Sequence, residues 1–208
     1  MKKVQDEDPE QFRQDLLTIE KHARTCQRIV ADLLNFSHSQ KSVRRKRQLN
    51  TLVDEVIVMV ASQFEKKKMK LEKDLSAEIP ELLIDGGRMR QVFLNLLMNA
   101  LYSGSEKGIV QISTRMSHQN RKVRVEFADN GEGIEPQVID KIFDPFFTTK
   151  PKGTGTGLGL SVSYGIVQDH GGDILVESEL GGWTRFSVLL PVDDVQVDDN
   201  QERFGRIQ

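Results

Sequence analysis

The chain has little of several features that mark particular classes of protein. Its 208 residues include one cysteine, Cys26, which excludes an internal disulfide framework and a cysteine-rich metal site. The longest apolar run, Val56–Ala61, is far shorter than the ~20 residues that cross a bilayer, and the lysine-led start lacks a signal-peptide core. A net charge of −2 argues against nucleic-acid binding through bulk charge. We therefore expect a cytoplasmic segment with no nucleic-acid partner and no membrane contact, although its parent protein could be membrane-anchored.

The first part of the chain predicts a long helix with a narrow apolar seam. From Phe12 onward, apolar residues recur at alternating spacings of four and three: Leu16, Ile19, Ala23, Cys26, Val30 and Leu33. This heptad pattern fits packing against another helix, in an antiparallel or oligomeric bundle, better than packing on a globular core. An ordinary surface helix on a monomer is the alternative.

Hydrophobic periodicity and turn residues divide the rest of the chain into helices and strands. A basic linker at 44–48 precedes a helix from about 51 to 66, and Asn50 is placed to be its N-cap. The pattern then predicts, in order, a strand over 69–75, a loop over 78–83, a helix from Asp85 to Ser103, a hairpin of 110–115 with 122–128, a helix after the glycine run that ends at Asp169 before Gly171 and Gly172, and strands over 173–177 and 183–190. This order indicates an α+β fold with a mainly antiparallel sheet and helices on one face.

A glycine-rich run, GTGTGLGL, precedes the last predicted helix and contains Gly153, Gly155, Gly157 and Gly159. Glycines let backbone N–H groups approach a ligand closely, and the start of a helix favours a polyphosphate. The run is not a P-loop, because no Gly-Lys-Ser/Thr follows, and Leu160 replaces the last glycine of a dinucleotide fingerprint. A different nucleotide-binding fold is therefore expected.

The helix after Asp85 has two amides one turn apart on a single face. Arg88, Gln91, Asn95, Asn99 and Tyr102 share that face, because three or four residues separate them. An amide that faces inward needs a hydrogen-bond partner or a cation, and its oxygen suits Mg²⁺. The pattern therefore indicates a polar pocket, with an ordinary wet helix face as the alternative.

Two further segments carry candidate binding residues. In DNGEGI, Asp129 ends a strand, where its carboxylate could accept from an exocyclic amine while Gly131 and Gly133 admit a flat ring; an ordinary turn is the alternative. IFDPFFTTK places three aromatic side chains around a proline: Phe143, Phe146 and Phe147. Such a cluster anchors a loop to the core or serves as the hinge of a lid.

In this order NLLMNA, DNGEGI, DPFFTTK, GTGTGLGL and GGWTRF resemble the N, G1, F, G2 and terminal boxes of the ATP-binding domain of sensor histidine kinases, within the GHKL ATPase superfamily. The resemblance covers 46–191 and looks most like the nitrogen-regulator type. It implies a Bergerat-type two-layer α/β sandwich, preceded by a long N-terminal helix. The implied parts are a partial dimerisation and phosphotransfer region over 1–42, a catalytic domain over 43–192 and an acidic mobile tail over 193–208.

The resemblance also implies roles for individual residues. Asn99 would coordinate Mg²⁺ on the ATP phosphates, with Asn95 supporting the ion or its waters, and Asp129 would accept from the adenine amino group. Lys150 would be a catalytic residue, as the two asparagines would be. Together with the glycine run, it would form an ATP lid. The other positions that would contact nucleotide are Tyr102, Gly131, Gly133, Ile134, Phe147, Gly155, Thr156, Gly157, Leu158, Gly159, Leu160 and Thr184.

The chain departs from this family pattern in two places. Tyr102 and Ser103 stand where many such kinases carry Lys and Tyr near the phosphates. The acceptor pattern, a histidine followed by Glu and then Pro, matches none of the four histidines, which are His22, His38, His118 and His170. The chain thus resembles a kinase core cut between the two helices of the dimerisation hairpin.

The function that the resemblance implies is transfer of the γ-phosphate of ATP to a histidine absent from this chain, for relay to the receiver domain of a response regulator. The full kinase would be a homodimer. A GHKL ATPase that hydrolyses ATP is one alternative, although its water-activating glutamate would stand where Asn95 is. A non-catalytic module for nucleotide binding or dimerisation is the other.

Overall fold

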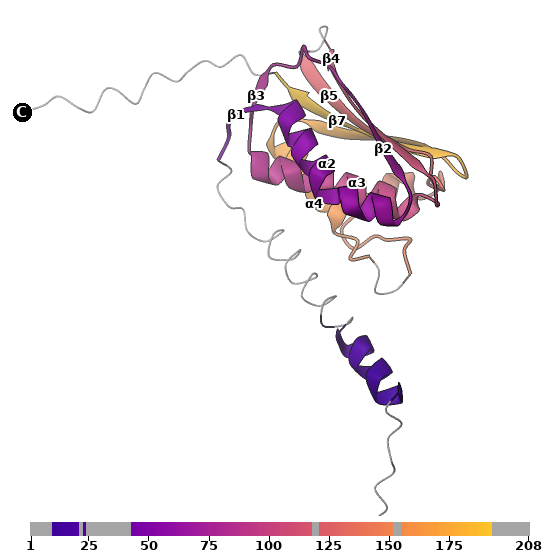
Figure 1. Cartoon of the computed structure of the whole chain (residues 1–208). Helices are drawn as coiled ribbons and strands as arrows, with labels where there is room; N and C mark the ends of the chain where they lie inside the picture. The colour runs from indigo at the N-terminus through magenta and orange to yellow at the C-terminus, as the bar shows by residue number, and fades with distance from the viewer. Residues whose placement is uncertain (1–9, 21–22, 24–42, 118–120, 152–154, 193–208) are drawn as a thin grey trace, which may run out of the picture.

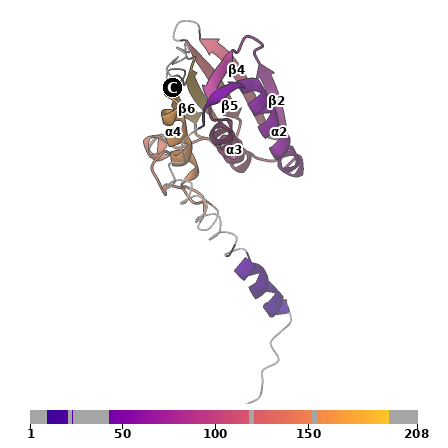
Figure 2. The ribbon, with the colours of Figure 1, turned by 90° about the vertical axis from the view of Figure 1, so that its left-hand side faces the viewer.

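The computed structural model describes residues 10–20, 23, 43–117, 121–151 and 155–192. Three helices lie on one face of a five-stranded sheet (Figures 1 and 2). They are α2 (Leu49–Lys66), α3 (Gly86–Ser103) and α4 (Gly159–Asp169). The predicted two-layer α+β arrangement is confirmed, and α3 lies between the other two helices, in contact with both.

The five-stranded sheet is mixed and mainly antiparallel, as predicted. Its strands are β2 (Lys70–Leu75), β4 (Ile109–Ser117), β5 (Lys122–Asp129), β6 (Asp173–Glu179) and β7 (Trp183–Pro191), in the spatial order β2-β4-β5-β7-β6. Only β2 and β4 run parallel, and each other neighbouring pair is antiparallel. The central strand, β5, ends at Asp129, directly opposite Thr184 of β7. This register brings two predicted site residues to one edge of the sheet.

A second, two-stranded sheet corrects two predictions. The basic linker contains β1 (Arg45–Gln48), and the predicted loop ends in β3 (Glu81–Ile84), which pairs with it antiparallel. Leu82 and Ile84 are buried, whereas β1 is exposed along its length. Neither strand has a strong pattern of its own, because each is stabilised by a partner more than 30 residues away in sequence.

Helix starts were predicted with mixed success. Asp85 is the N-cap of α3, and its side chain accepts hydrogen bonds from Gly87 and Arg88 N–H at 3.0 and 3.1 Å. Asn50, in contrast, lies inside α2, whose N-cap is Gln48, so the cap prediction was wrong. The Asn50 amide instead donates to Ser76 O at 2.8 Å, and its oxygen accepts from Thr114 Oγ1 at 2.9 Å. A buried partner on the sheet thus replaces the local capping role.

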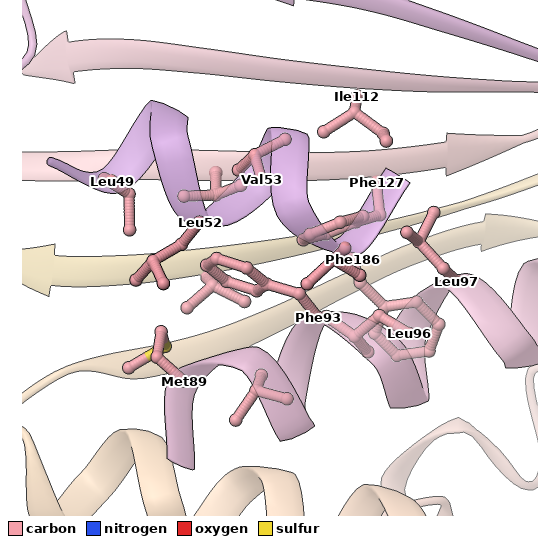
Figure 3. Close-up of a cluster of buried hydrophobic side chains, with 14 of the residues drawn as sticks. Leu49, Leu52, Val53, Met89, Phe93, Leu96, Leu97, Ile112, Phe127 and Phe186 are labelled. Atoms are coloured by element: carbon pink, nitrogen blue, oxygen red, sulfur yellow. The ribbon is translucent and has the colours of Figure 1, made fainter. Parts of the chain in front are cut away.

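The core lies between the helices and the sheet (Figure 3). The α3 face opposite the two asparagines is buried, as its periodicity predicts: Met89, Val92, Phe93, Leu96, Leu97 and Ala100. Phe93 packs on Phe127 of β5 with ring centroids 5.4 Å apart. Burying the apolar face against the sheet orients the opposite face, with its amides, toward α4.

The N-terminal part is helical where the structure describes it. Residues 10–20 form helix, and their apolar side chains Phe12, Leu16, Leu17 and Ile19 are 51% to 64% exposed. The rest of the predicted seam beyond residue 23, together with His22, His38, His118, Gly153, Thr154 and the tail from Asp193, lies outside the described residues. Among the described residues, no helix is long and apolar enough to cross a membrane.

Candidate functional site

Asp129 forms the centre of one end of the site. Its side chain is 5% exposed, and Oδ1 accepts hydrogen bonds from Gly131 N–H at 3.0 Å and from Ser103 Oγ at 3.2 Å. Burial raises the pKa of Asp129, and the two hydrogen bonds oppose that rise in part. Both hydrogen bonds described for the side chain go to Oδ1, so Oδ2 is the oxygen suited to an external donor such as an amine.

Two glycines let the loop after Asp129 pack closely. A Cβ on Gly131 would lie 2.6 Å from Asp129 Oδ1 and 2.8 Å from Ser103 O. Gly133 has φ +71°, and a Cβ there would lie 2.0 Å from Glu179 O. Both glycines are therefore required by contacts within the protein, which is a reason for them besides the predicted room for a base.

Thr184 is held by a hydroxyl network beside Asp129. It is buried, and its Oγ1 lies 3.0 Å from Ser178 Oγ on β6. Ser178 Oγ also donates to Trp183 O at 2.8 Å and accepts from Ile134 N–H at 2.9 Å. These contacts fix both the hydroxyl and the Ile134 backbone, two groups predicted to line the base.

Asn95 joins α3 to the first turn of α4. Its Nδ2 donates to Gly159 O at 2.6 Å and to Ser163 Oγ at 3.1 Å. A Cβ on Gly159 would approach the Asn95 amide to 3.1 Å, so the last glycine of the run permits this contact. The amide NH₂ is therefore committed to the protein, and the amide oxygen is the atom left for an ion or its waters.

Asn99 contacts the side-chain ammonium of Lys150. Lys150 Nζ donates to Asn99 Oδ1 at 3.0 Å and lies 4.2 Å from the centroid of the Tyr102 ring. Tyr102 thus contacts a lysine that lies just before the glycine run. An ammonium on the amide oxygen shows that this atom is available to a positive charge, as a magnesium ligand must be.

The glycine run has packing roles that its sequence does not reveal. Gly157 has φ +68°, and a Cβ there would lie 2.3 Å from the backbone of Phe146, which donates its N–H to Gly157 O. Leu158 is 1% exposed, so a nucleotide could reach only its backbone. Thr156 Oγ1 accepts from Leu158 N–H at 3.4 Å, and Gly155 lies beside Thr148 and Lys150. The run is thus fitted against the DPFFTTK segment just before α4.

The aromatic cluster is only partly anchored to the core. Phe143 and Phe147 pack against the core, as Ile134 and Leu160 do, and Phe143 lies 5.3 Å from Tyr164 of α4 between ring centroids. Phe146 is exposed and has φ +68°, an unusual conformation for a side chain of its size. The predicted anchoring therefore holds for two of the three aromatic residues.

The predicted site residues gather in two groups along α3. In one group Asn95 contacts α4, and Asn99 and Tyr102 contact Lys150, which lies beside Gly155. In the other, Asp129, Gly131, Gly133, Ile134 and Thr184 lie around the end of β5. Ser103 connects the groups, since it follows Asn99 by four residues, about 6 Å of helix, and contacts Asp129. Sequence reasoning assigned no role to Ser103, Ser163 or Ser178, because a serine hydroxyl has no distinctive pattern until its partner is known.

Comparison with known proteins identifies the family. The family model named histidine kinase-, DNA gyrase B-, and HSP90-like ATPase matches residues 84–194. The chain belongs to this ATPase family. The matched region begins at the end of β3 and includes both groups of site residues, which confirms the resemblance drawn from the five boxes.

Proteins that the chain resembles include sensor histidine kinases. Sensor histidine kinase ZraS of Escherichia coli is 33% identical over 178 residues, which are 86% of this chain and 37% of ZraS. The catalytic domain of histidine kinase ThkA is 34% identical, with TM-score 0.65 over 72% of this chain and 95% of that one. ThkA in complex with the response regulator protein TrrA gives 29% identity and TM-score 0.75 over 90% of this chain and 53% of that one. The chain therefore spans little more than a third of the length of ZraS.

Proposed function

We propose that this chain binds ATP with Mg²⁺ and transfers the γ-phosphate to a histidine on another segment or chain. The observation that carries the proposal is that α3 reaches both ends of one site. Asn99 and Lys150 lie at one end, and Ser103 contacts the buried Asp129 at the other. Phosphoryl transfer depends mainly on positioning and on neutralising charge, and these groups suit both tasks.

The base end suits adenine. The Oδ2 atom of Asp129 can accept a hydrogen bond from the exocyclic amine, and Thr184 offers a hydroxyl opposite it in the sheet. Gly131, Gly133 and Ile134 would line the ring through their backbone. Because the carboxylate accepts only from a donor, a purine without an amino group at this position should bind more weakly.

The phosphate end suits a magnesium complex. The amide oxygen of Asn99 would hold the ion, with Asn95 supporting it or its waters, and bound Mg²⁺ would neutralise charge on the phosphates. Lys150, which contacts Asn99, would move to the phosphates as a second positive charge. Tyr102, Phe147 and the backbone of 155–160, at the start of α4, would surround the phosphates.

One observation favours transfer over hydrolysis. A hydrolase needs a group that takes a proton from the attacking water, and Asn95 stands at the expected position of that base. Its amide donates to Gly159 O and Ser163 Oγ, and an amide does not accept a proton near neutral pH. The described site residues thus suit holding the phosphate for an incoming nucleophile.

Residues 1–42 are proposed to be part of the dimerisation and phosphotransfer region, 43–192 the catalytic domain and 193–208 a tail. The exposed apolar side chains of residues 10–20 support a helical partner, hence a homodimer in the full kinase. A response regulator receiver domain is the proposed final acceptor, by analogy with ThkA and TrrA. We also propose a cytoplasmic location for this segment, in keeping with its single cysteine.

Calorimetric titration of the full chain with ATP, with and without Mg²⁺, tests the binding step. We expect magnesium-dependent binding in the wild type, loss of that dependence in Asn99→Ala, and at least a tenfold loss of affinity in Asp129→Asn, about 1.4 kcal/mol. Asp140→Asn, which alters an exposed carboxylate outside the site, is the matched control and should bind as the wild type does.

Radiolabelled ATP tests the transfer step. The chain is incubated with γ-labelled ATP and a helical hairpin that carries an acceptor histidine, and we expect an acid-labile, base-stable label on the hairpin. Firm ATP binding without any label on the hairpin would contradict the kinase function. Steady release of inorganic phosphate would favour the hydrolase instead.

A further inference from the structure

Ser103 occupies an unusual place at the end of α3. Its hydroxyl lies 3.2 Å from Asp129 Oδ1 and 3.2 Å from Ala100 O of its own helix. A hydroxyl has one proton, so it can donate to only one of these oxygens at a time. The charged carboxylate is the stronger acceptor, which directs the proton to Asp129 while that group is ionised.

The backbone around Ser103 is held from two sides. Lys67 Nζ donates to the carbonyl oxygens of Leu101 at 2.6 Å and Tyr102 at 3.2 Å, and Glu132 N–H donates to Ser103 O at 3.4 Å. Lys67 thus satisfies carbonyls that the last turn of a helix leaves without partners. These contacts keep the Ser103 hydroxyl beside the carboxylate.

The surroundings of Asp129 disfavour its charged form, and hydrogen-bond donors oppose that effect. Burial raises its pKa, and the carboxylate of Glu132 raises it further, whereas the hydrogen bonds from Gly131 and Ser103 lower it. The carbonyl end of α3 also carries partial negative charge, which disfavours a nearby carboxylate. Lys67 offsets that charge, and Ser103 presents a proton at the same helix end.

We propose that Ser103 is a positioning residue for the nucleotide base: its hydroxyl donates to Oδ1 of Asp129 and holds the carboxylate so that Oδ2 can accept the adenine amine. The inference rests on the proposed function, because it assigns a task to the same nucleotide site. The Gly131 N–H is a backbone donor that side-chain substitution leaves in place. Of the two donors to Asp129, Ser103 is therefore the one that a side-chain substitution can remove.

The test compares ATP binding by the wild type and Ser103→Ala at pH 5.5 and at pH 8 with Mg²⁺. Titration of the nucleotide affects both proteins equally, so the ratio of their dissociation constants reports the protein alone. We expect the variant to bind less than about threefold more weakly at pH 8 and about tenfold more weakly at pH 5.5, where loss of the donor lets Asp129 protonate. A ratio that is equal at the two pH values would overturn the inference.

Three comparisons separate positioning from a general loss of structure. Ser103→Thr retains a hydroxyl and should restore most of the affinity at pH 5.5. Ser105→Ala removes an exposed hydroxyl two residues away and should leave binding unchanged at both pH values. Purine riboside triphosphate lacks the 6-amino group. For this nucleotide, the ratio of the dissociation constants of Ser103→Ala and the wild type should be nearly the same at pH 5.5 and at pH 8.

The two proposals fail in different ways. If the wild-type chain does not bind ATP at either pH, the proposed function fails and the role of Ser103 fails with it. If the wild type binds ATP and the loss in Ser103→Ala is the same with purine riboside triphosphate, the role of Ser103 alone fails. In that case the serine would stabilise the end of α3 without acting on the base.

Discussion

Substituting alanine for each of the two asparagines of α3 should separate a structural role from a ligand role. Asn95 makes two hydrogen bonds to α4, at 2.6 Å to Gly159 O and at 3.1 Å to the buried Ser163 Oγ. Asn99 accepts one hydrogen bond among the described residues, from Lys150 Nζ, and this contact is half-buried. Both changes are Asn to Ala on one helix, so the gain in helix propensity cancels when they are compared.

The magnitude follows from the bonds that each change removes. Two lost hydrogen bonds, one of them with the buried hydroxyl of Ser163, cost about 2 kcal/mol for Asn95→Ala, which is about 4 to 8 °C in Tm for a domain of this size. For Asn99→Ala the loss is one partly solvated contact with an ammonium, below about 1 kcal/mol. We therefore expect Asn95→Ala to melt several degrees lower than Asn99→Ala in the absence of nucleotide.

Thermal melting followed by circular dichroism measures this difference, with and without Mg-ATP. Mg-ATP should raise the Tm of the wild type by more than it raises that of Asn99→Ala, because the stabilisation by a ligand grows with its affinity. Gln91→Ala, on the same face of α3 and without a side-chain hydrogen bond among the described residues, is the control and should melt near the wild type. Equal losses of Tm for the two asparagine variants would refute the division of roles.

Two further predictions concern stability. Gly133→Ala places a Cβ 2.0 Å from Glu179 O and should lower the free energy of unfolding, measured in urea, by about 2 to 4 kcal/mol. The control is Gly181→Ala, which has a similar φ of +78° but open space around the added Cβ, and should lower it by about 1 kcal/mol. Equal losses would exclude the steric clash as the cause. Nε2 of His170 accepts from Asp85 N–H at 3.0 Å, and Nδ1 lies 2.7 Å from Ile166 O. Burial lowers the pKa of His170, and Arg44 and Arg88 lower it further, whereas the hydrogen bond to Ile166 O and the carboxylate of Asp85 oppose that shift. Below the ordinary histidine pKa of 6.5, the unfolded chain therefore binds more protons than the folded chain, so the free energy of unfolding should fall from pH 7.5 to pH 5. His170→Gln should lose part of this pH dependence. A slope that the substitution leaves unchanged would contradict this role for His170.

Much of the fold could be predicted where local pattern and final environment agree. Alternation in β4 and β5 and the apolar face of α3 follow from periods of two and 3.6, and Asp85 caps α3 through its own neighbours. The site residues could be predicted from their motifs because a family resemblance places them, although their contacts could not. The prediction of Asn50 as a cap failed because its amide finds distant partners instead: the buried Thr114 on β4 and the backbone of Ser76, just after β2.

By itself, the sequence determined the helices, the hairpin and the family, since these depend on short-range periodicity and on motifs within a few residues of one another. Only the tertiary structure decided the pairing of β1 with β3, the contact of Lys150 with Asn99, and the serines that hold Asp129 and Thr184. These features join segments that are distant along the chain. A hydroxyl, an ammonium or a strand edge has no defined role until folding brings its partner within hydrogen-bond distance.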